Sequence, residues 1–282
     1  MKPTEVYDPQ TLHEVQSWQL VILDEVARIC DKHGLTWFLD AGTALGAMRH
    51  GGFIPWDDDV DVSLLREDYD RFLEIAPREL PAWLRLDDPA KIRTMPSLFA
   101  KVCLNDSVFA TQETIDAGYD QGIFIDIFYY DLVAEDEQVR ASQIAQWKRA
   151  TYMKYLYFSP HSNVPHSGAL GMAERCACNV AHALLARTMS VDSFDRMMEH
   201  VRKMGREGAA PHDPLITLDY GRVPMRMSSI VPCTKAPFAG REYPVPAKVD
   251  DFLVNTYKNW HELPPEEKRH THKPVHIVFP NA

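Results

Sequence analysis

The chain has 282 residues, of which 45% are hydrophobic and 25% are charged, and its formal net charge is -10. These values are ordinary for a globular protein with room for one large domain or two smaller ones. The negative charge argues against an exposed nucleic-acid surface and against electrostatic adhesion to anionic lipid, because both depend on clustered Lys and Arg.

The N-terminal segment lacks the apolar core of a signal peptide, and no apolar stretch approaches the roughly 18 to 20 residues that span a bilayer. We therefore expect a cytoplasmic protein without a membrane span, for which peripheral membrane association stays open. The five cysteines are odd in number and scattered, which is typical of reduced thiols. Cys176, Cys178 and His182 have the spacing of half a zinc site, but no second pair of ligands accompanies them.

In residues 9–33, apolar side chains recur at intervals of three and four, which predicts an amphipathic helix that ends at Gly34. Residues 35–39 are predicted to form a short strand. This strand leads into Gly42 and Thr43, where a glycine permits close approach of a phosphate and the following amides can donate to it if they open a helix.

The next stretch is strongly acidic, with Asp57, Asp58, Asp59 and Asp61 directly before and within the apolar run 60–65. Like charges this close raise one another's pKa and destabilise the fold unless a cation neutralises them. On a strand, Asp59, Asp61 and Ser63 share one face, opposite an apolar face. Two such carboxylates are well placed to bind Mg²⁺, whose remaining positions go to substrate phosphates and water.

Two residues beside the acidic stretch are ambiguous. Arg49 precedes a predicted turn at Gly51 and Gly52, and its guanidinium suits either anionic substrate oxygens or one of the aspartates. Trp56 is interpreted as a packing anchor, with a stacking platform as the alternative.

Residues 67–75 are predicted to form a helix that ends near Pro77. Short strands are predicted at 84–86, 98–102 and 108–111, with a turn at Asn105 and Asp106 between the last two. Lys101 lies within one of these strands, either as a phosphate ligand or as an exposed edge lysine.

Residues 122–128 form an almost wholly apolar strand with Asp126 in its middle. An ionised carboxylate is costly to bury unless it is paired or coordinates a metal. If this strand lies beside residues 60–65, Asp126 joins Asp59 and Asp61 around one or two ions. The structural alternative is a core aspartate bonded to backbone or to an arginine.

Residues 135–185 have a helical pattern, and a third helix through Val201 is predicted with Asp192 or Ser193 as its cap. Beyond Gly208 the chain predicts a hairpin at 238–243 and a short helix at 249–257. These patterns divide the chain into a catalytic core (1–132), a helical lobe (133–207) and a C-terminal segment that packs back on the core (208–282).

Three blocks, residues 42–61, 122–131 and 257–272, resemble the LicD family of phosphocholine transferases, to which the fukutin-related ribitol-phosphate transferases are related. Tyr129 and Tyr130 depart from the family pattern, which often has proline after the phenylalanine. The resemblance implies an α/β (α+β) fold: a nucleotidyltransferase-like mixed sheet with flanking helices and a mainly helical additional lobe. The signature of that fold is matched by Gly42 with Thr43, by Asp59 with Asp61, and by Asp126.

The resemblance further implies transfer of a phospho-substituent, such as phosphocholine or an alditol phosphate, from a CDP-linked donor to a sugar hydroxyl of a glycan or glycolipid. In this scheme Mg²⁺, with Mn²⁺ as the alternative, is held by Asp57, Asp59, Asp61 and Asp126, and either Asp126 or Asp57 accepts the hydroxyl proton. The donor phosphates would be bound by Gly42, Thr43, Arg49, Lys101 and Arg269.

Two other functions stay open from the sequence. The first is a nucleotidyltransferase that releases pyrophosphate. The second is a non-catalytic metal-binding or sugar-binding module, because Asp57, Asp59 and Asp61 match positions 1, 3 and 5 of an EF-hand loop, although Val62 replaces its glycine. The transferred group is not fixed either, and Trp37, Trp56 and Tyr119 are candidates for an aromatic cage around a quaternary amine.

Overall fold

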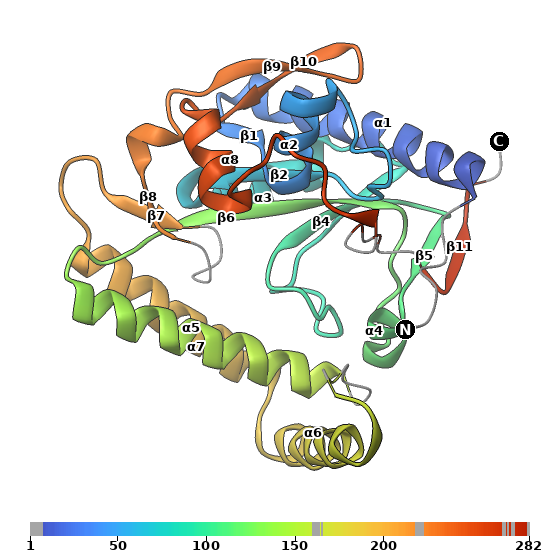
Figure 1. Ribbon diagram of the computed structural model, residues 1–282, viewed down its shortest axis with the longest axis vertical. Coiled ribbons are helices and arrows are strands. Elements are labelled where there is room, and N and C mark those ends of the chain that lie inside the picture. Colours follow the sequence, from blue (N-terminus) through green and yellow to red (C-terminus); the bar gives the residue numbers. More distant parts are fainter. Residues whose placement is uncertain are drawn as a thin grey trace.

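The computed structural model describes residues 8–159, 164, 166–217, 223–266, 269, 271 and 274–280. At its centre is a mixed sheet with the strand order β1-β2-β6-β4-β3, extended by β7 and β8 at the far end of β6 (Figure 1). Strands β2 and β6 are parallel, and the other neighbours along this path are antiparallel. The strands are β1 Trp37–Leu39, β2 Asp61–Leu65, β3 Leu84–Asp87, β4 Ala100–Leu104, β6 Phe124–Leu132, β7 Leu215–Thr217 and β8 Met225–Arg226. The predicted combination of a mixed sheet with flanking helices is confirmed.

Three helices from the first part of the chain contact this sheet: α1 Pro9–His33, α2 Ala41–His50 and α3 Arg66–Glu79. Helix α1 begins after Asp8, whose carboxylate accepts a hydrogen bond from the Thr11 amide, and ends at Gly34, which has a φ of 61°. Its predicted apolar stripe is buried. Helix α3 runs past Pro77 to Glu79, beyond the predicted end, because a proline near the end of a helix removes only one hydrogen bond of the last turn.

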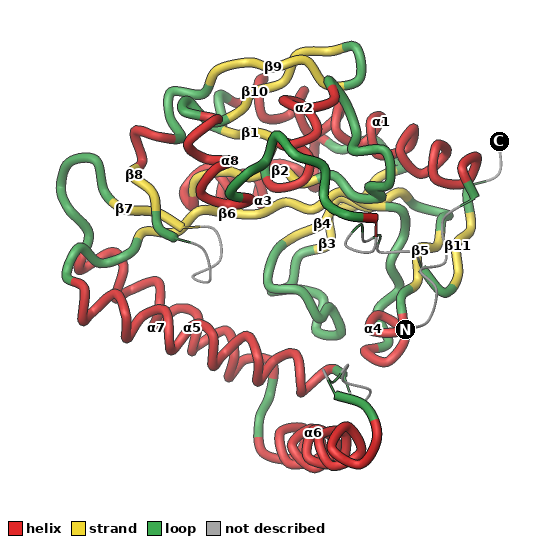
Figure 2. The backbone as a smooth tube through the Cα atoms, in the orientation of Figure 1, coloured by secondary structure: helices red, strands yellow, loops and turns green. Residues whose placement is uncertain are grey.

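A further layer of helices meets the sheet where α7 contacts β6 (Figure 2). It consists of α5 Glu137–Phe158 and α7 Val191–Gly208, which run side by side, and α6 Gly168–Thr188, which lies at the far end of α5 (Figure 1). The predicted cap of α7 is wrong. The helix is capped by Ser190, and Asp192 and Ser193 already belong to its first turn, where Ser193 completes the capping box.

The C-terminal segment returns to the sheet region. It contains η1 Met227–Ser229, the predicted hairpin as β9 Thr234–Phe238 and β10 Arg241–Val245, α8 Val249–Tyr257, and β11 His276–Val278, which pairs with β5 Val108–Ala110. The hydroxyl of Tyr243 on β10 donates to Asp24 on α1 at 2.8 Å. The short helix α4 Gln112–Ala117 connects β5 to β6. In the part of the chain that the structure describes, no helix has the length and apolar character needed to cross a membrane.

Candidate active site

Three neighbouring central strands place the acidic residues together. In the parallel pair of β2 and β6, Asp61 is the register partner of Asp126, and in the antiparallel pair of β4 and β6, Lys101 is the partner of the same Asp126. The expectation that the strand with Asp126 lies beside residues 60–65 is therefore confirmed. Asp59 and Asp126 both line a cavity of about 300 Å³ beside this sheet.

Asp61 is held at the start of β2 by helix α2. Its backbone amide donates to the hydroxyl of Thr43 at 2.8 Å, and its carbonyl accepts from the amide of Asp40 at 3.0 Å. The hydroxyl of Ser63 donates to the carboxylate of Asp40, which is the N-cap of α2, and both side chains are fully buried. The sequence predicts that Ser63 shares a strand face with Asp59 and Asp61. In the structure, α2 covers the strand at Ser63.

The carboxyl group of Asp61 has a strongly perturbed environment. Burial raises its pKa well above the usual value, and the charges of Asp59, Asp126, Asp40 and Asp57 raise it further. This repulsion is the effect that the crowded sequence predicts, and a bound cation would relieve it.

Lys101 is buried, with 8% of its surface exposed, and its ammonium group forms an ion pair with Asp126. The ammonium nitrogen also lies 3.7 Å from the ring centroid of Phe124 and 5.2 Å from that of Phe99. The alternative of an exposed edge lysine is wrong, because β4 lies between β6 and β3. Asp126 is therefore neutralised in part by a lysine of the protein, a partner that the sequence did not identify.

The acidic loop before β2 is fixed by α1. The amide group of Gln19, which is fully buried, donates to the carbonyl of Asp58 at 2.8 Å and to that of Phe124 at 3.2 Å, and Gln16 donates to the carbonyl of Asp57 at 2.9 Å. Neither glutamine was predicted. The available signal was a polar residue, Gln19, within the apolar stripe of the helix.

Gly42 and Thr43 lie within the first turn of α2. A Cβ atom at position 42 would lie 2.9 Å from a carboxylate oxygen of Asp57, so glycine leaves room for this side chain. The hydroxyl of Thr43 accepts from Asp61, as described above. Both residues thus shape the acidic cluster, and their predicted contact with phosphate stays a prediction.

The two predicted arginines connect the core and the C-terminal segment. Arg49 donates to the carbonyl oxygens of Trp260 at 3.0 Å and Glu262 at 3.2 Å, and burial lowers its pKa. None of the hydrogen bonds that Arg49 makes to described residues is to an aspartate. The guanidinium of Arg269 lies 4.5 Å from the ring centroid of Trp56, which makes Trp56 a stacking platform for the protein itself. Residues 267, 268, 270 and 272 of the third family block lie outside the described residues.

Two of the aromatic residues proposed as a cage are structural. Trp37 is buried and donates from its indole nitrogen to Asp31 at 3.0 Å, and Tyr119 is buried and donates to Asp87 at 2.7 Å. Neither lines the cavity that holds Asp59 and Asp126. The prediction is wrong for both, because large aromatic residues beside a site are as well suited to the core.

The donor chemistry of the cluster suits Mg²⁺ or Mn²⁺, since carboxylate oxygens are the ligands these ions prefer, and the repulsion at Asp61 favours a cation there. Among the described residues, however, no three His, Cys, Asp or Glu side chains are already arranged as a metal cage. The half zinc site is not completed there either: Cys176 is exposed and the Nδ1 atom of His182 lies 2.9 Å from the carbonyl oxygen of Leu156.

A glycine-containing helix, an aspartate pair leading into one strand and a third aspartate on the parallel neighbour define a nucleotidyltransferase-like domain. Residues 34–173 match the sequence model of the family described as LicD/FKTN/FKRP, nucleotidyltransferase domain. The chain belongs to the LicD family.

Two relatives show how far the similarity extends. The chain is 26% identical over 276 residues to the lipopolysaccharide cholinephosphotransferase LicD of Haemophilus influenzae, a match that covers 95% of this chain and 96% of that protein. It is 44% identical over 43 residues to the human ribitol 5-phosphate transferase FKRP, which covers 15% of this chain and 9% of that protein. The first similarity therefore extends over the helical layer and the C-terminal segment, whereas the second is local.

Proposed function

We propose that the protein transfers a phospho-substituent from a CDP-linked donor to a sugar hydroxyl of a glycan or glycolipid. The observation that carries the proposal is the convergence of Asp61 and Asp126 on adjacent strands, with Asp59 and Asp126 on the wall of an open cavity. The similarity to two relatives, a cholinephosphotransferase and a ribitol 5-phosphate transferase, supports this class of reaction.

In the proposed reaction, the acceptor oxygen forms a bond to the phosphorus that carries the substituent, and the bond from that phosphorus to the bridging oxygen of CMP breaks. Asp126 or Asp57 accepts the proton of the acceptor hydroxyl. A divalent ion held by Asp59, Asp61 and Asp126, with Asp57 nearby, would neutralise charge on the pyrophosphate and on the departing CMP.

The protein's own cation has a defined place in this scheme. Lys101 lines the same cavity as Asp59 and Asp126, and its ammonium group orients the carboxylate of Asp126 through their ion pair. It is also placed to donate to a phosphate oxygen that enters the cavity. Arg49, in contrast, is bound to tail carbonyls, so its proposed contribution is to hold the tail against α2.

The test is to supply CDP-linked compounds with Mg²⁺ and a glycan acceptor and to identify the small product. Release of CMP supports the proposal, and release of pyrophosphate from a nucleoside triphosphate would establish nucleotidyl transfer in its place. Excess EDTA should abolish turnover and added Mg²⁺ should restore it, so undiminished activity in EDTA would exclude the metal.

Two variants test the roles of the aspartates. Asp61→Asn and Asp126→Asn should each lose transfer by at least about a hundredfold while they keep the circular dichroism spectrum of the wild type. Asp106→Asn is the matched control, because Asp106 is exposed on a turn and asparagine tolerates its positive φ. Transfer at the wild-type rate by either site variant would refute the assignment.

A further inference from the structure

Helix α6 has an apolar face that no described part of the protein covers. Four large side chains on it, Leu170, Met172, Val180 and Leu184, are between 56% and 69% exposed. At about 3.6 residues per turn, five small exposed residues lie on the same side of the helix. They are Ala169, Ala173, Cys176, Ala177 and Ala183. Single apolar residues are common on protein surfaces, whereas a continuous apolar face is typical of an interaction site.

The opposite side of α6 packs on α5. The Nδ1 atom of His182 lies 2.9 Å from the carbonyl oxygen of Leu156 on α5, and Gly171 is buried. Glu174, which is the acidic residue of α6, belongs to this packed side and lies 2.7 Å from the Nδ1 atom of His166. The exposed apolar face of α6 therefore contains no carboxylate, and a cation, Arg187, lies in its last turn.

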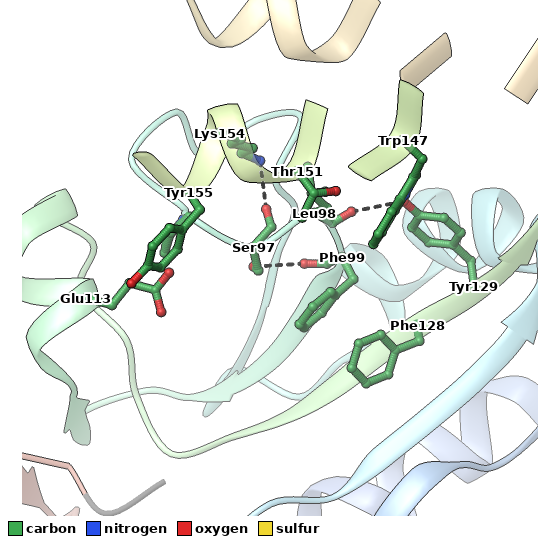
Figure 3. Close-up of a pocket in the computed structure, with 11 residues that line it drawn as sticks. Ser97, Leu98, Phe99, Glu113, Phe128, Tyr129, Trp147, Thr151, Lys154 and Tyr155 are labelled. Carbon is green, nitrogen blue, oxygen red and sulfur yellow. Dashed lines mark hydrogen bonds between the residues drawn. The ribbon is translucent and has the colours of Figure 1, made fainter. Parts of the chain in front are cut away.

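The outer face of α5 carries a basic pocket. The inner face is turned toward the sheet, because Trp147, Thr151 and Lys154 line a cavity of about 360 Å³ together with residues of the sheet (Figure 3). Arg149 is two positions from both Trp147 and Thr151, and it therefore lies on the opposite side of the helix. There it lines a pocket of about 300 Å³ with Arg196 of α7, and the described residues of this lining include no acidic side chain.

The guanidinium groups of this pocket are available to a ligand. Arg149 and Arg196 are both exposed. Arg149 makes no hydrogen bond or ion pair with a described residue, and Arg196 donates to the hydroxyl of Ser193 at 3.1 Å, which uses one of its five N–H groups. The nearby acidic residues of α7 have other partners: Asp192 and Asp195 pair with Arg93, and Glu199 pairs with Arg202 and Arg206. The pocket thus offers positive charge to an anion.

The helical layer, which consists of α5, α6 and α7, is basic within an acidic protein. Its three helices carry ten Lys and Arg residues and six Asp and Glu residues, whereas the whole chain carries 30 and 40. The net charge of -10, which argues against adhesion to anionic lipid, is therefore carried by the rest of the chain. A local excess of positive charge beside an apolar face favours an anionic surface as the partner.

The size of the apolar face argues against a second copy of the chain as its partner. A helix of 21 residues is about 32 Å long, so a face about 10 Å wide offers about 300 Å². Two copies would bury about 600 Å² in total, which is less than the roughly 1,200 Å² of a stable interface. A lipid surface has no such minimum, because buried apolar area and attraction between opposite charges both add to the binding.

We propose that the outer face of the helical layer docks on an anionic lipid surface. The apolar face of α6 lies at the boundary between head groups and acyl chains, and Arg149 and Arg196 bind lipid phosphates. This inference goes beyond the transfer reaction, because it assigns the surface by which the protein reaches an acceptor that is anchored in a membrane.

The test is cosedimentation with vesicles of phosphatidylethanolamine and phosphatidylglycerol. The wild type should partition at least about tenfold more strongly onto vesicles with about 30% phosphatidylglycerol than onto vesicles with about 10%. Val180→Asp and Leu184→Asp should each lower the partition coefficient about tenfold, since aspartate replaces an inserted apolar side chain and is repelled by the lipid phosphates. The double variant Arg149→Gln/Arg196→Gln should lower it about tenfold and should depend less on the phosphatidylglycerol fraction.

Matched controls carry the same substitutions elsewhere. Val254 on α8 is 51% exposed and Lys235 on β9 is exposed, and both elements lie on the side of the sheet away from the helical layer (Figure 1). Val254→Asp and Lys235→Gln should therefore keep the partition coefficient of the wild type. The circular dichroism spectrum and the Tm of every variant establish that it is folded.

The outcomes separate this inference from the proposed function. A wild type that stays in the supernatant with both kinds of vesicle overturns the inference, and so does wild-type partition by the folded α6 variants or by the folded arginine variant. A wild-type dimer in sedimentation velocity that Leu184→Asp converts to monomers would assign the face to a second copy and would also overturn it. Loss of vesicle binding confined to the α6 and arginine variants supports it, whether or not a CDP-linked donor is turned over.

Discussion

The buried amide of Gln19 is the contact that joins the acidic loop to both α1 and the sheet, so Gln19→Met should destabilise the protein. The substitution removes the donor to the carbonyl oxygens of Asp58 and Phe124 and keeps the side chain about the same size. The expected loss is therefore one of hydrogen bonds, with little contribution from a cavity.

The magnitude follows from these two contacts. Leaving a buried carbonyl without its hydrogen-bond donor lowers the free energy of unfolding by about 1 to 3 kcal/mol, and the substitution affects two carbonyls. The Oε1 atom of Gln19 has no hydrogen-bond partner among the described residues, so its removal recovers part of that loss. We expect a net decrease of about 2 to 4 kcal/mol in the free energy of unfolding, which corresponds to a Tm lower by roughly 5 to 10 °C.

The measurement is urea unfolding followed by circular dichroism, with the transfer rate measured on the same samples. Gln16→Met is the matched control, because Gln16 is only partly buried and makes one such bond, to the carbonyl of Asp57 at 2.9 Å. It should cost about 1 kcal/mol. If the unfolding free energy of Gln19→Met stays within about 0.5 kcal/mol of the wild type, the reasoning about the loop anchor is wrong.

Gly46→Ala should destabilise the protein by about 3 kcal/mol, because its new Cβ would overlap the backbone carbonyl of Gly52. Gly34→Ala should cost only about 1 kcal/mol, since its φ of 61° is strained but no atom lies within 4 Å; equal unfolding midpoints of the two variants would contradict this order. Burial lowers the pKa of Lys154 from 10.5 to about 8, so between these pH values the unfolded chain binds more protons than the folded one and stability rises with pH. Lys154→Met should lack this rise, although it also loses the bond to Ser97 at every pH. Parallel pH profiles of the unfolding free energy for the two proteins would refute this effect of burial.

Local sequence patterns were sufficient to predict that the acidic residues lie close together. The periodicity of residues 9–33 predicts α1, and the aspartate in the apolar run 122–128 points to a strand that must lie beside a charged partner. Both signals depend on neighbours close in sequence and on the cost of burying charge. This is why the pairing of Asp61 with Asp126 could be anticipated.

Contacts between distant segments could not be anticipated in the same way. Arg49 and the carbonyl of Trp260 are 211 positions apart, and no local pattern links them. Strand β11 pairs with β5, and Lys101 meets Asp126 only because β4 lies between β3 and β6. The order of strands in a sheet is set by packing across the whole domain, whereas a short strand pattern specifies only its own alternation.

The partners of the three buried carboxylates show at which of them stability and function conflict. Lys101 offsets the charge of Asp126, and Asp40 is bonded to Ser63 and caps α2. The hydrogen bonds that Asp61 makes to described residues involve its backbone, while its carboxyl group is buried among like charges that raise its pKa. Local conflicts of this kind persist in folded proteins mainly where function requires them. Asp61 is therefore the residue at which binding of a cation would change the local energetics most, and its replacement should separate activity from stability most clearly.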